Sequence, residues 1–246
     1  MIRWAGISNT DVGMIIEHYP KITVPRQKIE VQTVPGRSGD IIISSESFEN
    51  YEQAYDTFLD VKKFGGLEAA MPKVSDWLLG HPGYQRLEDS YFPDVYRMAY
   101  FTGGAQFVSL FNEYGEGTLT FNCAPEKYFK FGEKTITLTK GQKLINPTYF
   151  KAKPIYTVTG NFTDGNPGVL TITRDGTSAT FSIKNLGSNV NSVTIDAKLH
   201  KAYSGTANKN SSIEGKFEDL SLGKETVITW NNRITAVSII PRWWTI

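Results

Sequence analysis

The residues Trp230–Ile246 constrain the fold most, because they form an apolar, alternating run that ends in two adjacent tryptophans. Such alternation predicts a β-strand, since successive strand residues point to opposite faces. Chain ends are ordinarily mobile, but Trp243 and Trp244 would each bury roughly 200 Å² when packed. We therefore expect this end to dock into a domain or a partner, with Trp243 and Trp244 as structural anchors. One face of the strand would carry Ile234, Ala236, Ser238 and Ile240, and the other Val237 and Ile239.

Charge is divided unevenly along the 246 residues. Residues 1–134 hold 13 Lys and Arg against 18 Asp and Glu, a net charge of −5, and residues 135–246 hold 13 against 7, a net charge of +6. This asymmetry predicts two domains with different surroundings, and the length allows two. Aromatic residues make up 13% of the chain, which indicates packed cores. No concentrated basic patch typical of nucleic-acid binders is present.

Cys123 is the single cysteine, which excludes an internal disulfide and a cysteine-based zinc site. The N-terminal residues hold no apolar segment of signal-peptide length. No stretch approaches the roughly 18 apolar residues that span a bilayer. We therefore expect a soluble protein, without membrane insertion, that is made in a reducing cytoplasm.

The first half contains short β-branched and aromatic runs bounded by Gly, Pro and Asn, which predict strands. One short helix is expected from Pro72, which suits a first helical turn, to Gly80, with Trp77 as a structural anchor on its apolar stripe. The segment 49–64 fits a helix or an alternating strand, and the choice stays open. Strands are predicted at 14–19, 27–34, 40–44, 95–101, 106–111 and 117–123.

In the second half Thr, Ser, Asn and Gly become frequent, and turn signals recur at intervals of roughly ten residues, which is typical of a β-sandwich. Strands are predicted at 135–139, 155–160, 168–173, 179–183, 192–197, 225–230 and in the closing run. The sequence thus predicts a mainly β chain with one short helix, an α+β fold, in two domains at residues 1–134 and 135–246.

Side chains that could carry chemistry are few. His18, His81 and His200 lie far apart and have no metal-ligand partner at helical or hairpin spacing, so we expect surface or turn histidines and no metal site. Cys123 lies in an apolar strand run and is interpreted as a buried structural thiol, with a nucleophile as the alternative. No phosphate-binding glycine loop or nucleophile elbow occurs, so no catalytic residue and no cofactor is predicted.

The turn at residues 36–40 joins two predicted strands, and Gly36 and Gly39 are expected to supply positive φ angles there as structural anchors. Asp40 is expected to bond the turn backbone, and anion binding by this turn is the alternative. Glu88 and Asp89 are interpreted as solvent-facing loop residues.

Four aromatic residues of the second half could serve two purposes. Core packing is the first interpretation, and a sugar-binding groove on the sandwich is the alternative. The four are Tyr149, Phe150, Tyr156 and Trp230.

Short motifs then occur in an ordered series along the chain. They are Val34-Pro-Gly-Arg-Ser-Gly-Asp40, Trp77-Leu-Leu-Gly80, Tyr96-Arg-Met-Ala-Tyr100, Thr120-Phe-Asn-Cys-Ala-Pro-Glu-Lys-Tyr-Phe129, Asn146-Pro-Thr with Ala152-Lys-Pro-Ile, Val193-Thr-Ile-Asp196, Gly223-Lys-Glu-Thr-Val-Ile-Thr-Trp230 and Pro241-Arg-Trp-Trp244. Over essentially the whole chain, this series resembles the distal tail protein (Dit) family of siphophages, the bacteriophages with long non-contractile tails.

The resemblance implies an N-terminal belt domain that closes a hexameric ring and a C-terminal galectin-like β-sandwich. It implies a structural virion protein, and no enzyme, that forms the hub between the tail tube and the baseplate or tip at the distal end of the tail. The implied partners are identical copies in a homohexamer, the tail tube protein, a tail-tip or tail-associated protein and a receptor-binding protein for host attachment. DNA would pass through the channel without specific binding.

Two other classes of function compete with this hypothesis. One is a lectin-like module that attaches to host cell-wall polysaccharide, suggested by the sandwich and its aromatic residues. The other is a hydrolase, for which the sequence offers no assignable pair of acid and base.

Overall fold

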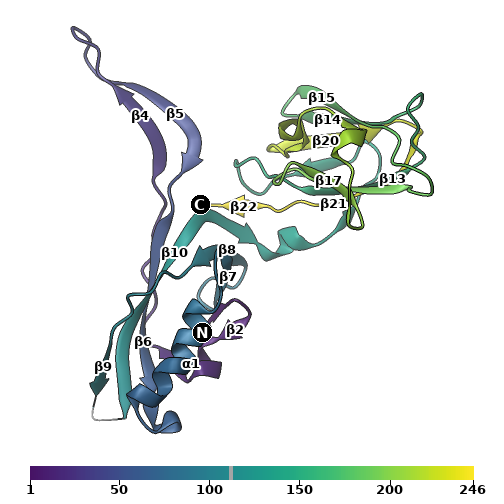
Figure 1. Ribbon diagram of the computed structural model, residues 1–246. Coiled ribbons are helices and arrows are strands. Elements are labelled where there is room, and N and C mark those ends of the chain that lie inside the picture. Colours follow the sequence, from purple (N-terminus) through teal and green to yellow (C-terminus); the bar gives the residue numbers. More distant parts are fainter. Residues whose placement is uncertain (111–112) are drawn as a thin grey trace. The chain divides into compact units, whose positions relative to one another are not determined.

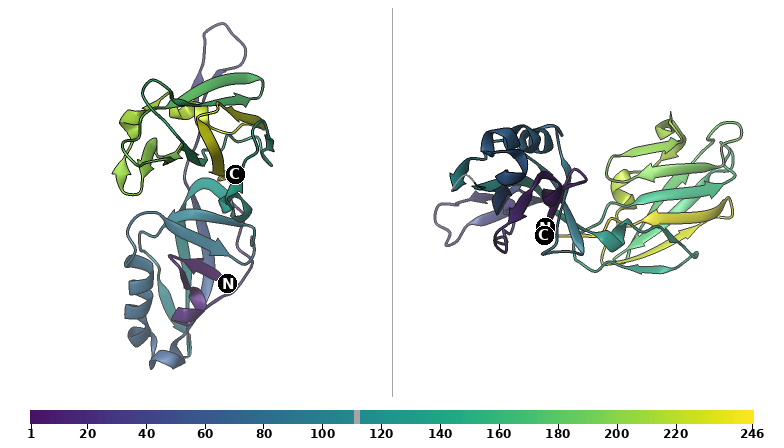
Figure 2. Two further views of the ribbon diagram at one scale, coloured as in Figure 1. Left: turned by 90° about the vertical axis from the view of Figure 1, so that its right-hand side faces the viewer. Right: turned by 90° about the horizontal axis from the view of Figure 1, so that it is seen from below.

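The computed structural model describes residues 1–110 and 113–246, and for Ser45 and Glu46 the backbone alone. These residues form two compact units, Met1–Lys127 with Ile246 (unit 1) and Tyr128–Thr245 (unit 2). The described chain is mainly β, and α1 is its one α-helix, as predicted (Figures 1 and 2). The composition shift suggested a boundary near residue 134, whereas the division falls inside strand β10, Tyr114–Phe129.

Unit 1 is built on one sheet with the strand order β2-β1-β7-β8-β10-β6-β3, and β9 also pairs with β10. Its predicted strand at 106–111 is β9, and the last residue of that prediction, Phe111, lies outside the described residues. The bounds are β1 Ile2–Trp4, β2 Ile7–Ser8, β3 Met14–Ile16, β6 Tyr51–Asp60, β7 Gln85–Asp89, β8 Val95–Tyr100 and β9 Phe107–Leu110, with 3-10 turns at Asn9–Val12 and Val61–Phe64.

The segment whose structure the sequence left open is strand β6. Its alternate residues from Tyr51 to Leu59 are buried, so the two-residue period decides between strand and helix. β10 pairs with it antiparallel over ten residue pairs, from Tyr114 opposite Asp60 to Cys123 opposite Tyr51. This long pair forms the middle of the sheet of unit 1.

The helix starts earlier than the sequence predicts, because α1 spans Leu67–Leu79 and the placement of Pro72 in its first turn is wrong. Gly65 and Gly66 both have positive φ and turn the chain into the helix. Pro72 lies on the exposed side, where water can satisfy the carbonyl that loses its N–H partner. The predicted apolar stripe is present, and Trp77 Nε1 donates to the Trp4 carbonyl at 3.3 Å.

Unit 2 contains a six-stranded sheet, β11-β21-β13-β16-β17-β18, and a five-stranded sheet, β12-β20-β14-β15-β19. Apolar residues of both sheets share one buried core, so unit 2 is a two-layer β-sandwich. The strands of these sheets are β11 Ile136–Thr137, β12 Lys143–Ile145, β13 Ile155–Gly160, β14 Gly168–Arg174, β15 Thr177–Ile183, β16 Ser192–Asp196, β17 Lys201–Ser204, β18 Ala207–Asn208, β19 Ile213–Glu214, β20 Glu225–Trp230 and β21 Ile234–Ile240, with 3-10 turns at Lys130–Glu133, Asn210–Ser212 and Phe217–Leu220. Strand β22, Trp244–Thr245, pairs with β10 and lies outside these two sheets.

The closing run is strand β21, which lies between β11 and β13. Val237 and Ile239 form its buried face, and a register shift opposite Thr159 and Gly160 also brings Ile234 into the core. Beyond the strand, Trp243 is 5% exposed and its carbonyl accepts the N–H of Phe129 at 2.9 Å. The end of the described chain is therefore packed and hydrogen-bonded.

Candidate functional site

The candidate site is a β-hairpin in unit 1 that has no covering layer. Strands β4, Gln27–Gln32, and β5, Ile41–Phe48, form a separate two-stranded sheet. In Figure 1 these two strands extend as an arm from the rest of unit 1. All six residues of β4 are exposed. A lone two-stranded sheet is marginally stable in water, so an arm of this kind gains most from a partner surface.

Apolar side chains lie on both faces of the hairpin. Val31 pairs with Ile42 and Glu30 pairs with Ile43, and paired residues share a face. Val31 is 50% exposed, Ile42 64% and Ile43 47%. Because these apolar side chains are exposed and the two strands form a separate sheet, the arm offers a surface for apolar packing against a partner.

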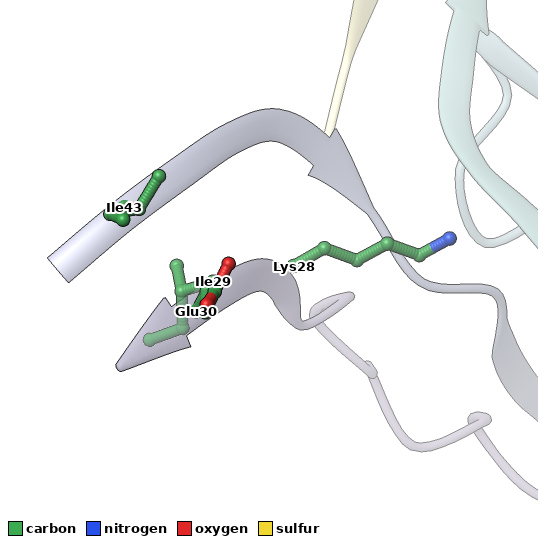
Figure 3. A pocket seen from close by; sticks show the side chains of 4 residues that line it. All are labelled: Lys28, Ile29, Glu30 and Ile43. Carbon is green, nitrogen blue, oxygen red and sulfur yellow. The ribbon is translucent and has the colours of Figure 1, made fainter. Parts of the chain in front are cut away.

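The arm borders a small hollow, and Figure 3 shows the four side chains that line it. Lys28, Ile29, Glu30 and Ile43 line it. Its lining combines two isoleucines with one charge of each sign, which suits a protein surface that supplies both apolar and ionic contacts.

The tip of the arm is a tight turn, as the sequence predicts. Gly36 has φ 81° and Gly39 has φ 82°, which both fall in the left-handed region that favours glycine. The N–H of Arg37 donates to the Val34 carbonyl at 3.1 Å. Asp40 Oδ1 accepts a hydrogen bond from the Thr33 hydroxyl at 3.0 Å, so this carboxylate closes the loop through a side chain.

Unit 1 also holds a buried ion pair that corrects the interpretation of Asp89 as solvent-facing. Asp89 ends the alternating strand β7, which directs its side chain into the core, and Arg97 Nη1 donates to it at 2.7 Å. Tyr55 donates to the same carboxylate at 3.0 Å, and Arg97 Nε donates to Tyr51 Oη at 2.9 Å. Glu88, the neighbour on the opposite face, is half-buried and pairs with Arg86.

Burial controls the chemistry of this cluster. It raises the pKa of the Tyr51 and Tyr55 hydroxyls, and the Asp89 carboxylate raises that of Tyr55 further. Burial also raises the pKa of the Cys123 thiol to about 12. Cys123 is fully buried, which fits the interpretation as a structural thiol.

The histidines are not brought together. His18 and His200 are exposed and His81 is half-buried, stacked edge-on against Trp4. Among the described residues no group of three His, Cys, Asp or Glu could hold a metal ion. No helix in the described part of the chain is long and apolar enough to cross a membrane.

The four aromatic residues of the second half do not form one surface. Tyr156 lies in the core and donates to the Leu220 carbonyl at 2.8 Å. Phe150 stacks on Trp244 with ring centroids 4.6 Å apart, and Trp230 is half-buried against the core. Tyr149 alone is displayed, with 86% of the side chain exposed. Core packing, the first interpretation, is therefore confirmed for Tyr156, and the alternative sugar-binding groove could not include this buried ring.

Comparisons with known proteins found likeness in structure. No family model and no curated protein matches the sequence. A crystal structure described as SPP1 Dit (gp 19.1), "a Paradigm of Hub Adsorption Apparatus in Gram-positive Infecting Phages", superposes with a TM-score of 0.73 at 14% identity, over 97% of this chain and 96% of that one. The chain has the Dit fold.

Two baseplate structures are similar to this chain at lower TM-scores. They are the phage p2 baseplate in its activated conformation with Sr and with Ca, with TM-scores of 0.52 and 0.50. Each is 10% identical and covers 94% of this chain and 91% of the other. The agreement over nearly the full length includes both units of the Dit fold.

Proposed function

We propose that this chain is a structural virion protein of a bacteriophage with a long non-contractile tail, where it forms a hexameric hub at the distal end of the tail. The exposed hairpin arm carries the proposal, because it needs a partner surface that one copy does not provide. The Dit fold over 97% of the chain supports the same function. The number six comes from the resemblance to distal tail proteins.

In a closed ring each arm would pack on the next copy. Such head-to-tail contacts use two different surfaces per copy, and cyclic closure leaves no free edge. The exposed apolar side chains of the arm would then be covered by the neighbouring copy. A ring closed in this way explains how residues with an exposed fraction near one half can be tolerated on β4 and β5.

The two domains of the hub would contact different partners. Residues 1–134, with a net charge of −5, would close the ring as a belt and contact the tail tube protein. Residues 135–246, with a net charge of +6, would form the galectin-like domain and carry tail-tip, tail-associated or receptor-binding proteins. Separate expression of the two compact units tests this division: residues 1–127 should still form rings, and residues 128–246 should fold as a monomer.

The channel of such a ring would let DNA pass without specific binding. Six copies of the first domain would carry an excess of about thirty negative charges. Where these charges face the channel, they repel the phosphates of DNA and prevent adhesion. A ring structure with a channel lined mainly by Lys and Arg would contradict this part of the proposal.

Native mass spectrometry across a concentration series tests the ring. We expect the mass of six chains, and we expect the double variant Val31→Asp, Ile42→Asp to dissociate, because it places two charges on one apolar face of the arm. Leu199→Asp is the matched control, since Leu199 is an exposed apolar residue of unit 2. A strict monomer at all concentrations, with no ring in the presence of tail partners, would contradict the proposal.

A further inference from the structure

Tyr149 is the most exposed large apolar side chain in the described part of the chain, at 86%. It lies in the loop 146–154, which connects β12 to β13 in unit 2. A lone exposed tyrosine gains no packing energy, and tyrosine is enriched among the residues that dominate protein–protein binding. The residues around Tyr149 therefore decide whether this side chain is suited to bind a partner.

The loop that displays Tyr149 is held rigidly. Asn146 is fully buried, its Oδ1 accepts the N–H of Thr148 at 2.9 Å, and its Nδ2 donates to the Phe150 carbonyl at 2.8 Å. The Thr148 hydroxyl donates to the Trp244 carbonyl at 2.8 Å. The residues on both sides of Tyr149 are thus fixed before any partner arrives, which lowers the entropy lost on binding.

The next aromatic residue is turned the other way. Phe150 stacks on Trp244 at an interplanar angle of 26°, and Trp244 Nε1 donates to the Lys151 carbonyl at 3.1 Å. Phe150 and Trp244 therefore anchor the loop to the sandwich. Tyr149 is left as the one ring that the loop presents outward.

Lysines lie beside the presented ring and in its loop. Residues 134–163 contain five lysines and no Asp or Glu. Lys151 and Lys153 are exposed residues of the loop itself, and Lys224 Nζ lies 4.8 Å from the centroid of the Tyr149 ring. Lys224 Nζ also donates to the Asn146 carbonyl at 3.0 Å, which fixes the ammonium group beside the ring.

The exposed ring and the lysines near it favour a protein partner over a small ligand. Sites for small ligands enclose most of the ligand surface, and a side chain that is 86% exposed has no walls around it. A projecting aromatic ring with lysines at its rim instead suits insertion into a pocket of another protein. The charge at the rim requires that pocket to be bordered by Asp and Glu.

We propose that the loop 146–154 docks on an acidic surface of a second tail protein, with Tyr149 as the anchor that enters a pocket. The identity of the partner as a tail protein rests on the proposed function of this chain. Tyr149 supplies the apolar contact, and Lys151, Lys153 and Lys224 supply the attraction that brings the acidic surface to it.

The test uses the full chain and the other tail proteins of the same virus, each purified separately. We expect one acidic tail protein to bind saturably, and Tyr149→Ala to weaken this binding at least tenfold. Tyr149→Phe should retain most of the affinity because it keeps the ring. Lys153→Glu should weaken binding most at low salt, since exposed charges are screened as salt rises. Leu199→Ala, at another exposed apolar residue of unit 2, should have no effect.

Other outcomes would overturn the proposal. They are the absence of binding to every tail protein, the same affinity for Tyr149→Ala as for the unchanged chain, and tight Tyr149-dependent binding of polyphosphate, which would indicate a polyanion site instead. Native mass spectrometry of the Tyr149→Ala variant separates the two proposals. A ring that persists while partner binding fails leaves the hub function standing, whereas a monomeric unchanged chain contradicts the hub itself.

Discussion

Arg242 forms a bidentate ion pair with Asp196, in which Nη1 donates to Oδ1 and Nη2 donates to Oδ2, each at 2.8 Å. The two residues are 46 positions apart. Arg242 has φ 54°, and its N–H donates to the Gly132 carbonyl at 2.9 Å. The pair therefore ties the residues after β21 to the end of β16 and fixes the direction in which Trp243 enters the core.

Arg242→Met should lower the free energy of unfolding of unit 2 by about 2 kcal/mol, because it leaves the nearly buried carboxylate of Asp196 without its charged partner. Arg242→Lys should lose part of that amount, since an ammonium group cannot form the planar two-point contact. Urea denaturation followed by tryptophan fluorescence measures both. Equal stability of all three proteins would show that water replaces the guanidinium group.

Acid should weaken the same contact. Burial alone would raise the pKa of Asp196, but the hydrogen bond from Arg242 and those from the Leu199 and Lys198 amides lower it overall. A carboxyl group whose pKa is lowered on folding contributes stability above its unfolded pKa of about 3.9. That contribution should disappear as the pH falls below about 4 through the folded pKa. Denaturation midpoints between pH 2 and 7 measure this loss, and Asp196→Asn should flatten the profile.

Trp243 contributes a large aromatic ring to the core of unit 2. Trp243→Ala should cost about 3–5 kcal/mol, as for other buried large aromatic residues, because Trp243 is 5% exposed within the core of unit 2. Trp244→Ala should cost less, since Trp244 is only half-buried and loses mainly its stacking on Phe150. Thermal unfolding compares the two variants. Unchanged melting temperatures in both would make the tryptophans a partner surface.

The buried pair Asp89–Arg97 should tolerate loss of one member poorly. Arg97→Met should destabilise unit 1 by about 3–5 kcal/mol, because it leaves a buried carboxylate without its counter-charge. Adding Asp89→Leu to Arg97→Met should recover much of the loss, since replacement of a whole buried pair by apolar residues is often neutral. A double-variant cycle in urea measures this coupling. Additive losses would show that the two charges act independently.

Two-residue alternation in the sequence predicted much of the fold. It located most strands of both units and the packed closing run, because a strand with one buried face has apolar residues at every second position. The same two-residue alternation, applied to Leu87 and Asp89, would have placed Asp89 in the core. An acidic residue is nevertheless predicted to be exposed as long as no partner for its charge is known. Arg97 lies eight positions away, on a different strand.

Other features left no local signal. Pro72 suggested a helix start, yet the two preceding glycines, Gly65 and Gly66, determine where α1 begins. Strand β4 of the hairpin arm has the same alternating pattern as a half-buried strand, and only tertiary structure shows that its apolar side chains are uncovered. The exposure of Tyr149 depends on hydrogen bonds from Asn146 and Thr148, which composition cannot predict.

The reactivity of the Cys123 thiol reports directly on the packing of unit 1. Burial raises its pKa to about 12, so at pH 8 the thiol stays protonated. Because the thiolate is the reactive form, the folded chain should react with a disulfide reagent such as DTNB far more slowly than the unfolded chain. Reaction in 6 M urea supplies the reference rate, and Cys123→Ala supplies the blank. The Arg97→Met variant should react faster than the unchanged chain, since a loosened core opens more often. Rapid reaction of the folded, unchanged chain would mean that Cys123 is accessible, and would contradict the buried β6–β10 pair on which unit 1 is built.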